Sequence, residues 1–201
     1  SDLTHMPFED VAALRAFPEL TIIEPTDEVM LEKLLHQLVD LKGMYYIRCA
    51  RKAVVRLYDS QEEFEIGKGK ELREGTDVTI IASGIMTAES LKAADVLAEK
   101  GISARVVDMF TIKPLDKELV LKCAEETGAV VTAENHSMYN GLGSAVCEVL
   151  AENLPVPVER IGIEDEFGEV GDMEYLKKRF HLTAEDIVKK AEKAIERKSR
   201  K

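Results

Sequence analysis

Apolar residues along this chain recur in two rhythms, as short runs of strand length and as longer stretches with helical spacing. From Asp77 onward the two rhythms alternate, with predicted strands at 78–82, 104–110, 129–133 and 158–163 and predicted helices at 87–100, 116–127, 142–153, 172–180 and 183–197. Strands and helices that alternate with short connections form an open, mostly parallel sheet with helices on both faces. The predicted fold class is therefore α/β, and residues 76–201 are expected to form one complete domain.

Before this domain lies a smaller α/β region. A helix is predicted at 5–17, and strands at 20–24 and 44–49 flank a helix that Asp27 caps, which makes one parallel β-α-β unit. A separate fragment of this size would bury too little surface to be stable alone. We therefore expect residues 1–60 to be the C-terminal part of a larger α/β domain.

The region between these two parts has no regular period. It is rich in glycine and charge, and residues 64–66 and 70–72 could pair as a short hairpin. Residues 61–75 are accordingly predicted to be a linker.

Composition narrows the function classes. The 201 residues carry 27 Lys and Arg against 38 Asp and Glu, a net charge of −11, and 45% of them are hydrophobic. These values are typical of a globular protein and argue against a nucleic-acid binder. Apolar runs are shorter than the roughly 20 residues of a membrane span, and the polar start at Ser1 does not have the pattern of a leader. Three cysteines without CxxC spacing indicate packed, reduced thiols and a cytoplasmic protein.

A glycine-rich turn follows the strand predicted at 129–133. Residues 141–145 read Gly-Leu-Gly-Ser-Ala and open a helix, as the phosphate turn of a dinucleotide site does, but the third glycine is absent. Close packing of helix on strand explains the same glycines. Residues 67–70 (Gly-Lys-Gly-Lys) lack the spacing of a phosphate loop and are predicted to form a loop.

Polar residues follow two predicted strands. Glu134 and His136 lie just after residues 129–133, where open α/β sheets bind ligands, so they could exchange protons or line an interface. The acidic residues 165–169 follow the last strand without His or Cys partners, and no metal site is predicted. His36 and His181 are interpreted as structural or exposed.

His5 and Arg51 are the other candidates. His5 precedes a helix, and Arg51 follows a strand, with Arg48 three residues earlier. A guanidinium at a strand end can bind a phosphate through paired hydrogen bonds, although both residues could also be surface positions.

Taken in order, these motifs resemble the transketolase family. Residues 1–10 (Ser-Asp-Leu-Thr-His-Met-Pro-Phe-Glu-Asp) resemble the family's Thr-His segment, and Cys49-Ala50-Arg51 its Ser-Arg after a strand. The resemblance continues through residues 77–84, 112–116, 134–137, 141–145, 167–169 and 182–188, as in transketolase C-terminal domains. It implies that residues 1–60 belong to a pyrimidine-binding domain and residues 76–201 are the transketolase C-terminal domain.

The resemblance also implies an activity. Transketolases use thiamine diphosphate and Mg²⁺ to move a two-carbon ketol unit between sugar phosphates in the pentose phosphate pathway, and the cofactor holds the carbanion. By this resemblance His5 is the catalytic candidate and Arg51 binds the sugar phosphate. The family's aspartate, four residues before the histidine, corresponds to Ser1, so Asp2 is the substrate-binding candidate one place later. His181 replaces a glycine of the family pattern.

The metal- and diphosphate-binding pattern of the family, Gly-Asp-Gly followed by Asn, does not occur in the chain. We therefore expect a split transketolase, in which this C-terminal section pairs with a diphosphate-binding N-terminal section as a homodimer or heterotetramer. The isolated chain is expected to bind no cofactor and to be inactive, and its start at Ser1 is expected to be a truncation.

Two alternatives stay open. The chain could be the β subunit of a 2-oxoacid dehydrogenase or part of a deoxyxylulose phosphate synthase, because these enzymes share the motif at 111–116. It could also be a non-catalytic assembly module.

Overall fold

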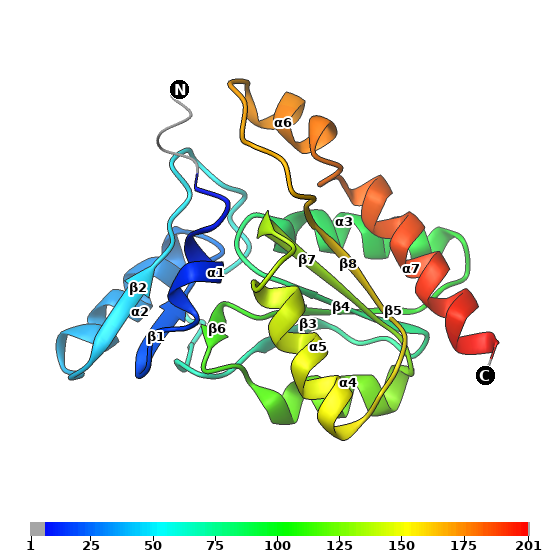
Figure 1. Ribbon diagram of the computed structural model, residues 1–201, viewed down its shortest axis with the longest axis horizontal. Coiled ribbons are helices and arrows are strands. Elements are labelled where there is room, and N and C mark those ends of the chain that lie inside the picture. Colours follow the sequence, from blue (N-terminus) through cyan, green and yellow to red (C-terminus); the bar gives the residue numbers. More distant parts are fainter. Residues whose placement is uncertain (1–6, 201) are drawn as a thin grey trace.

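The computed structural model describes residues 7–200, which form two α/β layers that meet along one side (Figure 1). Its elements are α1 Asp10–Leu14, β1 Leu20–Ile23, α2 Glu28–Val39, β2 Met44–Ile47, β3 Lys70–Arg73, β4 Val78–Ala82, α3 Met86–Glu99, β5 Ala104–Asp108, β6 Thr111–Lys113, α4 Lys117–Thr127, β7 Val130–Ser137, α5 Leu142–Asn153, β8 Val158–Ile163, α6 Met173–Arg179 and α7 Ala184–Ser199.

The larger sheet confirms the predicted fold class. It has five strands in the order β3-β5-β4-β7-β8, and all neighbours are parallel except the edge pair β3 and β5. Side chains alternate across β4, so Ile80 packs with α3 and α7 on one face while Ile81 packs with α4 and α5 on the other. The sheet is therefore open, mostly parallel and covered by helices on both faces.

The hairpin expected in the linker is wrong. Residues 64–66 form no strand, and Lys70–Arg73 pairs with β5 at the edge of the larger sheet. Phe64 is instead buried, with edge-to-face contacts to Tyr58 and Phe110. The backbone groups of an open sheet edge provide a better partner for β3 than a three-residue strand could.

The smaller sheet has the order β2-β1-β6. The predicted parallel pair of β1 and β2 is confirmed, but β6 was not predicted. The expected strand at 104–110 ends at Asp108, and Thr111–Lys113 then pairs antiparallel with β1. A three-residue strand is too short to show a period, and its partner is far away in the sequence.

Residues after β5 also complete the core of the smaller sheet. Phe110 packs with residues of α2 and the 57–66 segment, and Ile112 packs with Val11 of α1 and Ile22 of β1. Residues that follow β5 of the larger sheet thus supply both core side chains and the third strand of the smaller sheet. No helix among residues 7–200 is both long and apolar enough to cross a membrane.

Candidate functional site

A cavity of about 220 Å³ lies where the two sheets meet. One wall comes from the smaller sheet region and the other from the larger, where α6 and the residues around it contribute most. The residues that line it are Pro7, Phe8, Asp10, Glu24, Pro25, Tyr46, Ile47, Arg48, Cys49, Ala50, Arg51, Lys52, Gly84, Ile85, Asn135, Gly171, Met173, Leu176, Lys177, Phe180 and Leu182. The edge-to-face contact of Phe8 with Phe180, 5.4 Å between ring centroids, joins the two walls.

Arg48, at the carboxyl end of β2, donates hydrogen bonds to three protein groups. Its Nη1 donates to Glu24 Oε1 at 2.5 Å, its Nε to Asp10 Oδ2 at 3.0 Å, and its Nη2 to the Pro7 carbonyl at 3.0 Å. Tyr46 donates to the same Asp10 oxygen at 2.7 Å. Burial would by itself lower the pKa of Arg48, but the charges of Glu24 and Asp10 hold it above its ordinary value.

The phenol of Tyr46 shares this environment. Burial, together with the hydrogen bond to Asp10, raises the pKa of Tyr46 to about 12. The group is therefore a neutral donor at physiological pH. This wall of the cavity therefore presents a neutral phenol beside a guanidinium that stays positively charged and is held by three acceptors.

Arg51 differs from every other arginine in the described part of the chain. The others each donate to a carboxylate or a backbone carbonyl or, for Arg105, form an ion pair with Glu126, whereas Arg51 has no protein partner among residues 7–200. It lines the cavity beside Lys52 and is exposed to solvent. In a chain of net charge −11, two adjacent cations at a cavity form a local site for an anion.

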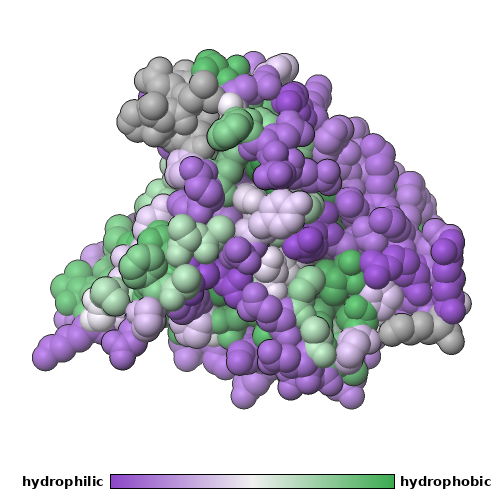
Figure 2. Space-filling model, in the orientation of Figure 1, coloured by the Kyte–Doolittle hydropathy of each residue, from purple (hydrophilic) through white to green (hydrophobic). Residues whose placement is uncertain are grey.

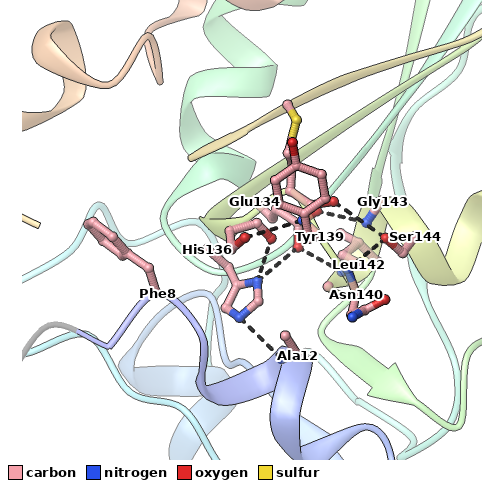
Figure 3. Close-up of polar contacts among 12 residues, drawn as sticks. Phe8, Ala12, Glu134, His136, Tyr139, Asn140, Leu142, Gly143 and Ser144 are labelled. Atoms are coloured by element: carbon pink, nitrogen blue, oxygen red, sulfur yellow. Dashed lines mark hydrogen bonds and ion pairs between the residues drawn. The ribbon is translucent and has the colours of Figure 1, made fainter. Parts of the chain in front are cut away.

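His136 is a buried interface residue. Residues 134–137 were predicted to follow a strand, but they form the last part of β7, which continues to Ser137. His136 Nε2 accepts from the Ala12 amide at 3.3 Å, and its Nδ1 lies 2.6 Å from the Ser137 carbonyl (Figure 3). The imidazole thus bridges α1 and the end of β7 and holds α1 against the larger sheet.

The side chain of Glu134, in β7, lies at the N-terminus of α5. Its carboxylate accepts from the amides of Leu142 and Gly143, at 2.7 and 2.8 Å (Figure 3). A Cβ on Gly141 would lie 1.9 Å from this carboxylate, and one on Gly143 would lie 2.7 Å from Thr132 Oγ1. The glycines therefore permit close packing, and the protein's own carboxylate fills the place where a dinucleotide phosphate would bind.

The acidic loop after β8 is also structural. Glu166 and Glu169 both pair with Arg179 of α6, at 2.6 and 3.1 Å. Among residues 7–200, no three His, Cys, Asp or Glu side chains are grouped to hold a metal ion.

The cavity residues do not fit the diphosphate and Mg²⁺ end of thiamine diphosphate. The carboxylates that line the cavity are Asp10 and Glu24, and both are already bound to Arg48. Glu24 also accepts from Ser83 at 2.6 Å. Both carboxylates therefore already face the Arg48 guanidinium, which repels a metal cation placed beside them.

The other predicted residues have mixed outcomes. His5 and Asp2 lie outside the described residues, so their roles stay predictions. His36 and His181 are exposed, as expected. The expectation of packed thiols is wrong for Cys49, which is exposed where its strand has ended at the cavity.

Sequence patterns missed a buried polar cluster between the sheets. Asp108 is fully buried at the end of β5, and its Oδ2 accepts from Thr26 at 2.6 Å and Tyr58 at 2.8 Å. Burial raises the pKa of Asp108 to about 7 in spite of these hydrogen bonds. Asp27 adds a second carboxylate that accepts from the amides of Leu57 and Tyr58. An aspartate directly after two valines, within the strand predicted at 104–110, was the available signal.

The fold and the cavity define an open α/β protein whose candidate site lies between two sheets. Residues 67–187 match the family described as "Transketolase, C-terminal domain". The chain belongs to the transketolase family.

Three relatives illustrate this. The chain is 50% identical over 196 residues to "6-deoxy-6-sulfo-D-fructose transketolase subunit SqwH" of a Clostridium species, across 98% of this chain and 61% of that protein. It is 43% identical to "Putative transketolase C-terminal section" of Methanocaldococcus jannaschii, across 93% of this chain and 59% of the relative. It is 40% identical to "1-deoxy-D-xylulose-5-phosphate synthase" of Heliobacterium modesticaldum, across 94% of this chain and 30% of the relative.

Among solved structures, the chain is similar to "Split gene transketolase, inactive beta4 tetramer". The TM-score is 0.94 at 44% identity, over 98% of this chain and 64% of that one. The chain thus spans about three fifths of the length of the subunits and sections it matches.

Proposed function

We propose that this chain is the C-terminal section of a split, thiamine diphosphate-dependent transketolase that transfers a ketol unit between anionic sugars. The family match and the relatives named as transketolase subunits support this assignment. The observation that carries the substrate class is Arg51, which lies at the cavity between the sheets and has no protein partner in the described part of the chain. A guanidinium without a protein partner can give paired, charge-assisted hydrogen bonds to the terminal phosphate of a sugar.

The cofactor chemistry belongs to a second polypeptide in this proposal. A diphosphate-binding N-terminal section holds thiamine diphosphate and Mg²⁺, and this chain binds and orients the sugar. His5 is proposed to donate hydrogen bonds or move a proton beside the reacting carbons, and Asp2 to contact a substrate hydroxyl. The isolated chain is proposed to be inactive, like the inactive β4 tetramer of the split-gene transketolase to which it is similar.

A substitution of Arg51 tests the substrate class. In the full-length polypeptide, reconstituted with its N-terminal section, Arg51→Ala should raise the KM for ribose 5-phosphate about 10- to 100-fold with little change in kcat, the size of a charged hydrogen bond. The KM for unphosphorylated ribose should stay unchanged. Arg56→Ala is the matched control, because Arg56 is an exposed arginine five residues away that does not line the cavity.

An unchanged KM in Arg51→Ala would show that Arg51 does not bind the sugar phosphate.

The competing enzyme class has support of its own, since the 40% identical relative is named as a deoxyxylulose phosphate synthase. Assaying the reconstituted enzyme with xylulose 5-phosphate and ribose 5-phosphate against pyruvate decides between ketol transfer and 2-oxoacid chemistry. Assembly without turnover of either substrate would favour the non-catalytic module.

A further inference from the structure

Arg48 joins three separate segments through one side chain. From the end of β2 it reaches the Pro7 carbonyl, Asp10 at the start of α1, and Glu24 just after β1. Its backbone amide also donates to the Ile23 carbonyl at 2.8 Å, which extends the pairing of β1 with β2. One guanidinium therefore fixes the approach to α1 against the ends of both strands.

The partners of Arg48 are themselves held in place. Glu24 accepts from Ser83 of the larger sheet, and a Cβ on Gly84 would lie 2.9 Å from the Glu24 carboxyl carbon. Asp10 is held through Oδ2, which accepts from both Arg48 and Tyr46, while its buried Oδ1 has no hydrogen-bond partner among residues 7–200. The cluster is thus anchored on both sheets, and Arg48 has little freedom to rearrange.

Stability alone gives a weak reason for such a cluster. Taking charges out of water costs about as much as a buried ion pair returns, so an apolar cluster of similar size would stabilise the fold equally well. The geometry instead fixes positions, because a guanidinium with three occupied directions holds its partners at defined distances and angles.

The two arginines at the end of β2 differ in their hydrogen bonds to the protein. Arg48 gives three of its five N–H groups to protein acceptors, whereas Arg51, three residues later, has no protein partner among residues 7–200. The Arg48 side chain therefore fixes both the segment around Pro7 and the end of the strand that leads to Arg51.

We propose that Arg48 is a positioning residue that fixes the segment around Pro7 and Asp10 against the end of β2, and so sets the spacing between this segment and Arg51. The catalytic part of this inference rests on the proposed function, but the positioning part can be measured without turnover.

Hydrogen exchange measures the positioning. In the full-length polypeptide, Arg48→Met should speed exchange of the amides at residues 8–10 about tenfold or more, because their segment loses its anchor. Arg15→Met is the matched control: Arg15 also binds a carboxylate, Glu148, at 2.6 Å, and contacts the Asn140 carbonyl, but it does not line the cavity. Exchange at residues 8–10 that stays at the wild-type rate in Arg48→Met would overturn the proposal.

Kinetics of the reconstituted enzyme separate positioning from binding. Arg48→Met should lower kcat about tenfold or more and change the KM for ribose 5-phosphate less than about threefold, because Arg51 remains in place. Arg48→Lys should fall between Arg48→Met and wild type, since one ammonium cannot hold two carboxylates and a carbonyl in the same geometry. A raised KM with unchanged kcat would make Arg48 a substrate ligand and overturn the proposal, as would kinetics equal to those of Arg15→Met.

Glu24→Gln covers the case in which Arg48→Met does not fold. It keeps the shape of the side chain and removes one charge, so the same changes are expected at smaller size. If wild-type enzyme shows no ketol transfer at all, the proposed function fails, and the exchange experiment still decides whether Arg48 positions the segment.

Discussion

The strands of the two sheets are buried to different degrees. In the larger sheet, β4 is covered on both faces and both edges, and all five of its residues are buried. In the smaller sheet, β2 lies at an edge and none of its residues is fully buried. Among residues 7–200, eleven large hydrophobic side chains are exposed, and six of them lie between residues 17 and 55, namely Phe17, Leu35, Val39, Leu41, Met44 and Val55. Figure 2 shows the corresponding apolar surface over the α2, β1 and β2 side of the molecule.

This difference indicates that the smaller region needs residues of the larger region to complete its core. Its core is completed by Phe110 and Ile112, which follow β5, and its third strand is β6. The larger sheet takes no strand from the first 60 residues. We therefore expect substitutions in the larger sheet region to change the stability of the chain more than equivalent ones in the smaller.

A matched pair of leucines gives the largest expected contrast. Leu97 of α3 is fully buried and Leu35 of α2 is 45% exposed, and both lie in helices. Leu97→Ala should lower the free energy of unfolding by about 2–5 kcal/mol, because it leaves a cavity among packed side chains. Leu35→Ala should change it by less than about 0.5 kcal/mol. Urea unfolding of the isolated chain measures both, and equal losses would break the comparison.

The contact between the two regions contains a pH-dependent group. The pKa of Asp108 is raised from 3.8 to about 7, so the folded state binds this proton more tightly than the unfolded state. The contribution of Asp108 to stability is therefore full below about pH 4, falls as the pH rises towards 7, and is constant above, a change of up to about 4 kcal/mol.

Asp108→Asn removes this titration while its oxygen can still accept from Thr26 and Tyr58. The unfolding free energy of wild type minus that of the variant should therefore decrease between about pH 4 and pH 7.5, as measured by urea unfolding at each pH. Subtraction cancels the other carboxylates, which titrate in both proteins. A difference that is constant with pH would show that Asp108 stays ionised in the fold.

The smallest effect is expected at a strained backbone position of the larger region. His181 precedes the capping box of α7 and has φ of +55°, a conformation that glycine adopts without strain. His181→Gly should raise the free energy of unfolding by up to about 1 kcal/mol, because relief of the left-handed strain exceeds the entropy cost of glycine. His36→Gly, in the middle of α2, is the contrasting control and should destabilise by about 1 kcal/mol. Destabilisation by His181→Gly would show that the imidazole, which lies 3.8 Å from Asp186, matters more than the backbone.

The candidate site was only partly predictable. Arg51 became a candidate from its place after a predicted strand together with the resemblance to the transketolase family, and the structure places it at the cavity. Arg48 and Asp10 could not be paired in advance, since their contact spans 38 positions and depends on how α1 crosses the end of β2. The role of His136 was left open for the same reason, because its partner Ala12 is 124 positions away.

Local patterns alone determined the parallel α/β class, the order of the helices and of most strands, and the cap of α2 at Asp27. These features depend on residues within a few positions of one another, so the sequence contains them directly. Only the tertiary structure decided that β3 joins the larger sheet and β6 the smaller, and that the cavity forms between them. Edge pairing and a shared core depend on contacts between segments far apart in sequence, whose geometry is set when the two sheets pack together.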